Sequence, residues 1–323
     1  MKIDFETHII PKEYIKKLEK RSVVPRIERD DRGRMYMAYW ENVRYPITEE
    51  LYDPDVKIRD METAGVNAQV LSLPITGADW LDSRQGSELA RLYNNSVAEM
   101  IRDYPGRFVG SAALPLQDVK QAVIELQRAV DELGFKAVTV YSNVAQKPVA
   151  SERFYPLYEM IEKLDIPILL HPTVPVMGRA LKDYKLLPAI GFPMDTTIAI
   201  MTMIMSGLLD KYPHLNFVLP HLGGVFPFLM ARIDKESCKI PGWGTSRLPS
   251  NYLKRVYVDT VSLHQPAMLC AYTSMGVERI VFGSDYPYWD IPSCVKSVEE
   301  LPIPENEKQK IFCDTPKQLL KMA

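Results

Sequence analysis

Four stretches of this sequence each carry a short apolar run that stops on a side chain able to bind a metal or move a proton. These side chains are Glu6, His8, His171, His221 and Asp285. Glu6 and His8 lie two positions apart, and a strand turns residues i and i+2 to the same face. Imidazole and carboxylate groups make a mixed nitrogen–oxygen ligand set, which suits zinc and also manganese. The spacing therefore predicts a divalent metal centre.

We assign the five side chains two roles. Glu6, His8, His171 and Asp285 form the predicted ligand set, and His221 is the predicted general acid or base beside it. Alone, each has an ordinary structural explanation, since an isolated histidine on an apolar run is more often a buried core residue and Asp285 lies in a turn-like segment. Their joint occurrence at the ends of predicted strands favours the metal site. His264 follows the seventh strand, where we expect a residue at the rim of the site.

The segments that position these residues alternate regularly between strand and helix. Strands are predicted at residues 1–8, 68–73, 108–113, 137–141, 166–170, 217–219, 256–259 and 280–282. Helices are predicted at residues 56–64, 88–104, 119–133, 154–164, 196–209, 225–233, 266–274 and within 293–323. The pattern indicates an α/β fold, a (β/α)8 TIM barrel, as one domain over residues 1–323.

An open doubly wound sheet is the alternative architecture. Two features favour the barrel. No glycine-rich phosphate loop follows the first strand, and the candidate residues sit at the ends of strands one, five, six and eight. In a closed barrel these ends meet at one mouth, whereas in an open sheet they lie in a row.

One segment, at about residues 21–52, interrupts the alternation. The run Arg29–Gly33 separates two β-favouring stretches and predicts a β-hairpin insertion at the working face of the barrel. A loop is also predicted at residues 241–244.

The composition is ordinary for a soluble globular protein that can bury a large core. Hydrophobic residues make up 46% of the 323 residues, and the net charge of −2 gives no sign of a nucleic-acid or membrane-surface partner. We find no apolar run of the roughly 20 residues that a membrane span needs. The four cysteines form no CxxC pair and are read as free thiols. A soluble cytoplasmic protein is expected.

The chain resembles the amidohydrolase superfamily, in the branch typified by aminocarboxymuconate-semialdehyde decarboxylase. That branch includes the γ-resorcylate and 5-carboxyvanillate decarboxylases. The resemblance runs over nearly the whole chain and is most specific at residues 170–172, 194–199, 220–228 and 282–287. It implies one divalent metal ion, with Zn²⁺ ahead of Mn²⁺.

The resemblance also implies roles for individual residues. Glu6 and His8 match the first metal pair, while His171 and Asp285 match the ligands of strands five and eight. Asp285 is then also a proton carrier, and His221 matches the assisting histidine. Arg232 matches an arginine that reaches a substrate carboxylate across a homodimer interface, and Arg44 lies near the position of a second substrate-binding arginine.

Three departures leave the substrate open. Thr48 stands where the semialdehyde decarboxylase has an arginine, and Ala189 where it has an aromatic residue. Gly224 replaces a glutamate of the resorcylate and carboxyvanillate enzymes. We predict a metal-dependent, non-oxidative decarboxylase of a small aromatic or unsaturated hydroxy or oxo carboxylic acid. The alternatives are a metal-dependent hydrolase or hydratase and a barrel that binds a ligand without catalysis.

Overall fold

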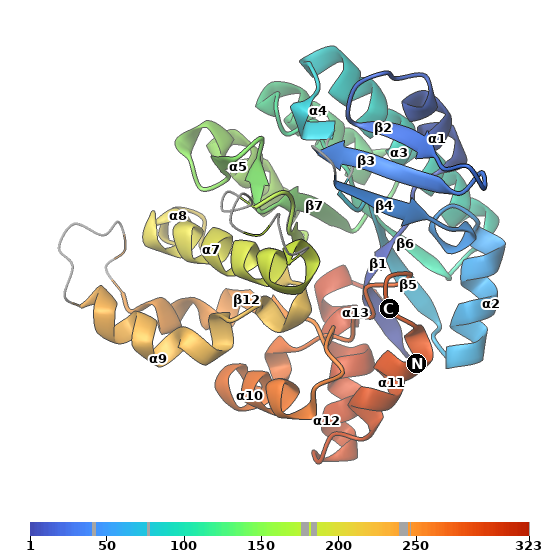
Figure 1. Cartoon of the computed structure of the whole chain (residues 1–323). Helices are drawn as coiled ribbons and strands as arrows, with labels where there is room; N and C mark the ends of the chain where they lie inside the picture. The colour runs from blue at the N-terminus through green and yellow to red at the C-terminus, as the bar shows by residue number, and fades with distance from the viewer. Residues whose placement is uncertain are drawn as a thin grey trace.

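Parallel strands form the centre of the molecule, and they neighbour one another in the order of the chain (Figure 1). The computed structural model describes residues 1–40, 43–75, 78–175, 181, 186–238, 245 and 247–322. The sheet contains β1 (Ile3–His8), β5 (Ala68–Ser72), β6 (Phe108–Ala112), β7 (Ala137–Tyr141), β10 (Ile168–His171), β11 (Phe217–Leu219) and β12 (Val256–Val258). Each pair is parallel, as expected of strands joined by helical crossovers.

The eighth predicted strand closes the gap between the two edge strands. The Val281 amide donates to the Val258 carbonyl at 3.0 Å, and the Phe5 amide donates to the Phe282 carbonyl at 2.8 Å. This segment is irregular, with isolated parallel bridges pairing Val258 with Ile280 and Thr7 with Tyr286. This connection closes the ring of strands and confirms the (β/α)8 prediction.

Side chains from all eight segments meet in one apolar cluster inside the sheet. Its members are Ile3, Phe5, Ala68, Val70, Val109, Ala137, Leu169, Val218, Tyr257 and Val281, with Leu319 and Leu320 of the last helix. The backbone hydrogen bonds that join the eighth segment to β1 and β12 close the ring around this cluster. A second, larger cluster lies between the strands and the surrounding helices. The ring is therefore a packed core whose polar site occupies one end.

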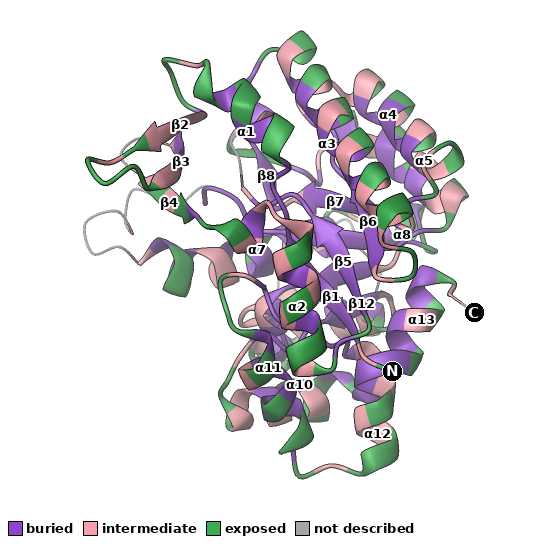
Figure 2. Cartoon of the chain, turned by 90° about the vertical axis from the view of Figure 1, so that its right-hand side faces the viewer, coloured by how far each residue is buried: buried purple, intermediate pink, exposed green. Residues whose placement is uncertain are grey.

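Helices surround the strands and turn their exposed faces outward (Figure 2). They are α1 (Lys12–Glu19), α2 (Pro54–Ala64), α3 (Ser83–Asp103), α4 (Val119–Asp131), α5 (Tyr155–Leu164), α7 (Phe192–Met205), α8 (Leu208–Lys211), α9 (Phe226–Ser237), α10 (Gln265–Met275), α11 (Ile291–Glu299), α12 (Glu305–Gln309) and α13 (Thr315–Leu320). Short 3₁₀ turns are η1 (Glu49–Leu51), η2 (Ala78–Trp80), η3 (Glu152–Phe154), η5 (His221–Gly223), η6 (Pro249–Arg255) and η7 (Val277–Arg279), and π turns are η4 (Leu187–Gly191) and η8 (Lys310–Asp314).

Two of the helices that differ from their predicted bounds do so for clear local reasons. α3 begins at Ser83 and not at residue 88, because the Asp82 carboxylate accepts the Gln85 amide at 2.8 Å and caps the helix there. The helix predicted at residues 196–209 is divided into α7 and α8. Gly207 lies at the break with a φ of 78°, a left-handed conformation that glycine adopts readily.

One apolar stretch corrects an expectation from the sequence. Residues Leu187–Met205 span 19 residues with a mean hydropathy of 1.4, which is long and apolar enough to cross a membrane by length and composition. Half of this stretch is buried inside the fold. Ile200, Met203 and Ile204 are fully buried in the outer apolar cluster, so the helix packs against the barrel.

The predicted insertion after the first strand is a three-stranded antiparallel sheet. Its strands are β2 (Arg26–Arg29), β3 (Met35–Trp40) and β4 (Val43–Ile47), and the predicted hairpin joins the first two. A further two-stranded hairpin consists of β8 (Asn143–Val144) and β9 (Lys147–Pro148). The loop predicted at residues 241–244 lies outside the described residues.

Candidate metal centre and active site

A β-bulge in the first strand turns Glu6 and His8 toward the barrel axis. Asp4 pairs with Gln69 and Thr7 with Leu71, so two residues of β1, Phe5 and Glu6, oppose Val70 alone. Ile3 and Phe5 face the interior cluster, and strict alternation would then send Glu6 and His8 outward. The extra residue shifts the alternation by one, which is how bulges re-aim side chains at active sites.

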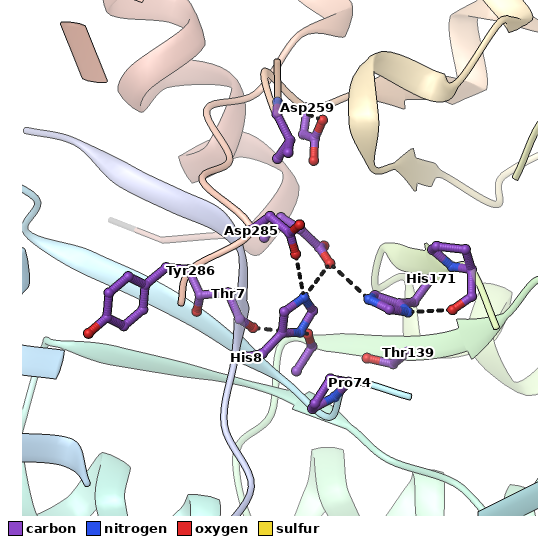
Figure 3. Close-up of polar contacts among 12 residues, drawn as sticks. Thr7, His8, Pro74, Thr139, His171, Asp259, Asp285 and Tyr286 are labelled. Carbon is purple, nitrogen blue, oxygen red and sulfur yellow. Dashed lines mark hydrogen bonds and ion pairs between the residues drawn. The ribbon is translucent and has the colours of Figure 1, made fainter. Parts of the chain in front are cut away.

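Three of the predicted ligands converge on one point, and Figure 3 shows two of them, His8 and His171. The Oε1 atom of Glu6 lies 3.4 Å from Nε2 of His8 and 3.7 Å from Nε2 of His171. One ligand atom from each of these residues falls within 4.8 Å of the others, and all three side chains are buried. His171 is the last residue of β10 and shares the inward face of Leu169. The strand ends thus deliver the ligands.

Hydrogen bonds at the Nδ1 atoms of the two histidines, on the side of each ring away from Glu6, assign the ring protons. The Ser72 hydroxyl donates to the Thr7 carbonyl at 2.9 Å, so its oxygen accepts from Nδ1–H of His8 at 2.9 Å. The Nδ1–H group of His171 donates to the Pro172 carbonyl at 2.7 Å. Both Nε2 atoms therefore carry lone pairs toward Glu6, and such bonds behind the rings are typical of metal-binding histidines.

The charge balance of this cluster fits a cation. Oε1 of Glu6 is buried and has no hydrogen-bond partner. Nε2 of His8 also lies 2.9 Å from Oδ1 of Asp285, and with its proton on Nδ1 both facing atoms are electron-rich. An orphaned carboxylate oxygen and opposed lone pairs are costly in a buried site. A divalent ion would satisfy these atoms together, and the nitrogen–oxygen set suits Mn²⁺ or Zn²⁺.

The pKa values of these groups reflect the same crowding. Burial raises the pKa of Glu6 well above its usual range, and the carboxylates of Asp259 and Asp285 raise it further. Burial, together with the neighbouring His8 ring, lowers the pKa of His171 to about 3. His171 is therefore neutral at pH 7, the form in which imidazole binds metal.

Asp285 links the ligand cluster to His221. Its Oδ2 atom lies 3.6 Å from Nε2 of His221, while its Oδ1 atom faces His8. Burial would raise the pKa of Asp285, but the facing imidazoles, His221 first, outweigh burial when they carry a proton toward the carboxylate, and they then hold that pKa below its usual range. Burial opposes charge on His221 as well, yet the adjacent Asp285 raises the pKa of the imidazole. The pair can hold and pass a proton.

Both members of this pair have left-handed backbones. His221 has a φ of 57° and Asp285 a φ of 58°. Non-glycine residues in this region cost roughly 1–3 kcal/mol each and cluster at functional sites. The geometry aims both side chains into the mouth of the barrel.

A cavity of about 510 Å³ opens over this pair. His171, His221 and Asp285 line one side, and Tyr45 of the inserted sheet and Tyr288 lie with them. The Tyr288 ring is 5.6 Å from the His8 ring and 6.2 Å from the Tyr45 ring, so the insertion forms part of the site. This size is typical of small-molecule sites.

The three predicted substrate-binding residues lie outside the lining of this cavity. Arg44 is exposed on β4, where its guanidinium stacks 4.6 Å from the centre of the Tyr36 ring and lies 3.5 Å from a Glu28 carboxylate oxygen. Arg232 is exposed on α9. His264 is exposed before α10 and borders an adjoining hollow. Within one chain, the described structure brings together the five central residues and leaves these three apart.

Two residues beside the site were given no role from the sequence. Asp259 follows β12 directly, and its buried Oδ1 accepts the amides of Leu222 and Val261, each at 3.0 Å. Ser72 ends β5 and supports His8. Each is a polar residue ending a short apolar strand, the same signal that identified His171. Tyr45 had no comparable signal, because its position depends on how the insertion folds over the barrel.

Comparisons with known proteins find similar sequences over most of the chain. The sequence profile of a family described as Amidohydrolase matches residues 3–322. The chain is 29% identical over 294 residues to a 2-amino-3-carboxymuconate-6-semialdehyde decarboxylase from Dictyostelium discoideum, covering 89% of this chain and 82% of that one. It is 31% identical over 291 residues to a gamma-resorcylate decarboxylase from Polaromonas sp. (strain JS666 / ATCC BAA-500), covering 83% and 87%.

A solved structure extends the likeness to three dimensions. A dihydroxybenzoic acid decarboxylase from Polaromonas sp. JS666, with bound manganese and the inhibitor 2-nitroresorcinol, matches with a TM-score of 0.85 and 28% identity. The match covers 99% of this chain and 96% of that chain.

Proposed function

Because the chain belongs to the amidohydrolase family, we propose that it is a metal-dependent, non-oxidative decarboxylase of a small hydroxylated aromatic carboxylic acid. The observation that carries the proposal is the meeting of Glu6, His8 and His171 with the His221–Asp285 pair beside one cavity. Decarboxylases among the relatives support the reaction class, and they do not favour the hydrolase alternative.

Glu6, His8, His171 and Asp285 would hold one divalent ion. We propose Mn²⁺ ahead of Zn²⁺, since half of these ligands are carboxylates and oxygen ligands suit manganese. A bound manganese in the Polaromonas structure supports this choice. When bound, such an ion would withdraw electrons from the carboxylate and hydroxyl oxygens of the substrate.

The reaction breaks the bond between the ring carbon and the carboxylate carbon. The electron pair stays on the ring carbon, CO₂ leaves, and that carbon takes a proton. His221 and Asp285 line the cavity, with Nε2 of His221 3.6 Å from Oδ2 of Asp285, so we assign them this transfer. The apolar side chains around them exclude water and favour loss of charge from the substrate.

We further propose a homodimer that acts in the cytoplasm. Phe228 and Arg232 are one helical turn apart on α9, so they share a face, and Phe228 is 77% exposed. An exposed aromatic residue beside an arginine is typical of an interface core. Arg232 would then lie in that interface beside Phe228. Light scattering that gives a monomer mass at micromolar concentration would contradict this arrangement.

The reaction is tested by incubating Mn²⁺-loaded protein with hydroxybenzoic acids and measuring CO₂ release in D₂O. We expect one deuterium at the ring carbon that lost CO₂. Asp285→Asn should lower kcat at least 100-fold, while Asp82→Asn, at the exposed start of α3, serves as the matched control. Hydrolysis of an amide or lactone, with solvent ¹⁸O in the product and no CO₂ from any acid, would refute the proposal.

A further inference from the structure

The cavity beside the proposed metal site has one polar side and an extended apolar wall. His171, His221 and Asp285 occupy the polar side. Ile75, Phe192, Leu222, Val261 and Trp289 contribute to the wall. These five come from segments after β5, β11 and β12, from the start of α7 and from before α11, so the apolar character is shared by most of the rim.

Small residues extend the wall away from the polar side. Ala267 lines the cavity and also an adjoining hollow of about 440 Å³, and Leu222 and Gly224 border both spaces. Phe228 and Cys270 continue the apolar surface in that hollow. A single aromatic ring bound at the polar side would leave room toward Ala267 that a chain of several carbons can enter.

We propose that the preferred substrate is a hydroxybenzoate with an apolar substituent on the ring, such as an alkyl chain, and not one with a second charged group. This preference rests on the proposed decarboxylase function. The carboxylate and hydroxyl groups of the substrate face the polar side, and the substituent packs on the wall. Among the described residues that line the cavity there is no lysine or arginine to receive a second carboxylate. An unpaired charge against an apolar wall is strongly disfavoured.

Burial of alkyl carbon sets the size of the expected effect. Each buried methylene contributes about 0.8 kcal/mol, which is roughly a fourfold gain in affinity or in kcat/KM. Three added carbons should therefore raise kcat/KM by roughly 50-fold, if each is fully buried. A carboxylate of similar size at the same ring position should lower it below that of the unsubstituted acid.

The test uses 2-hydroxybenzoic acids with hydrogen, methyl, ethyl, propyl, carboxylate or aminomethyl at each ring position in turn. CO₂ release gives kcat/KM for the acids, and calorimetry gives Kd for the matching phenols, which cannot turn over. At one ring position at least, we expect kcat/KM of the acids to rise and Kd of the phenols to fall as the alkyl chain lengthens. Equal or better results with the charged series would overturn the preference.

Two variants locate the effect on the wall. Val261 is 3% exposed, and Val261→Thr replaces a methyl by a hydroxyl at similar volume, so the ratio of propyl to unsubstituted acid should fall. Ala267→Leu should fill the passage to the adjoining hollow and penalise propyl more than methyl. Unchanged ratios in both variants would place the alkyl group elsewhere and refute the proposal.

The two proposals fail differently. CO₂ release without any gain from alkyl groups would overturn the substrate preference alone. Alkyl-dependent binding of the phenols without CO₂ release from any acid would overturn the decarboxylase function, and the apolar preference of the cavity would stand.

Discussion

Asp259 should hold the turn that carries His221, and its removal tests how that turn is maintained. Its Oδ1 atom accepts the Leu222 and Val261 amides, and the side chain is fully buried. His221 and Leu222 both have left-handed backbones, with φ of 57° and 55°. Asp259→Ala would leave two buried amides without an acceptor and remove the tie between this turn and the end of β12.

The expected loss of unfolding free energy follows from these two amides. Each unsatisfied buried donor costs about 1–3 kcal/mol, so the variant should lose roughly 2–6 kcal/mol of unfolding free energy. The Oδ2 atom of Asp259 is buried without a partner, and burial raises the pKa of Asp259 to about 7. Removing this unpartnered oxygen offsets part of the loss, so we expect the variant to lose about 2–4 kcal/mol of unfolding free energy. A domain holds only about 5–15 kcal/mol in total.

Urea unfolding and steady-state kinetics measure the two consequences. Asp259→Ala should unfold at lower urea and lose at least 10-fold in kcat, because His221 no longer keeps its direction. Asp259→Asn retains one acceptor oxygen and should restore most of the stability. Asp82→Ala, which removes an exposed helix cap, should cost about 0.5–2 kcal/mol and leave kcat as in the wild type. An Asp259→Ala protein with the wild-type urea midpoint and kcat would refute the reasoning.

Three further predictions concern the metal, the hydrogen bond that supports His8, and a buried lysine. Chelation of the metal should lower the thermal midpoint, and added Mn²⁺ should restore it; ion at 100 times its Kd contributes about 2.7 kcal/mol. Ser72→Ala removes the acceptor behind His8 and should weaken Mn²⁺ binding about 10–100-fold by calorimetry, against an unchanged Kd for Ser87→Ala. Burial lowers the pKa of Lys57 to about 7 from 10.5. Between these two pH values the unfolded chain binds more protons than the folded chain, so the unfolding free energy should rise with pH from about 7 to 10. Lys57→Met should flatten that rise in urea titrations, and an equal slope in both proteins would contradict it.

The alternation of elements was predictable because it rests on local patterns. Apolar runs of three to six residues give the strands, and the helices between them begin and end at residues such as Asp53 and Gly65, which cap α2. The convergence of the candidate residues followed from topology, since the carboxyl ends of parallel strands in a barrel share one face. Glu6, His8, His171, His221 and Asp285 meet at that face.

The parts that sequence patterns could not predict depend on departures from regular structure. Strict alternation from Ile3 and Phe5 would point Glu6 away from the site, and only the bulge opposite Val70 brings it inward. The eighth strand is held by single bridges and not by a regular ladder. Tyr45 reaches the cavity because the inserted sheet folds over the barrel mouth, a contact between distant segments that no local pattern encodes.

Gly224 shows how the backbone near His221 limits which side chains the site can carry. Its φ is +66°, and a Cβ atom there would lie 2.1 Å from the Pro193 carbonyl oxygen and 2.6 Å from the Thr197 hydroxyl. That hydroxyl also accepts the Val225 amide at 3.0 Å, which fastens the turn to α7. Because the turn passes so close to α7, this position accepts only glycine, and an acidic side chain would force the two apart. The proposed proton transfer at this edge of the cavity is therefore assigned to His221 and Asp285, and Gly224 lines the cavity together with the apolar wall.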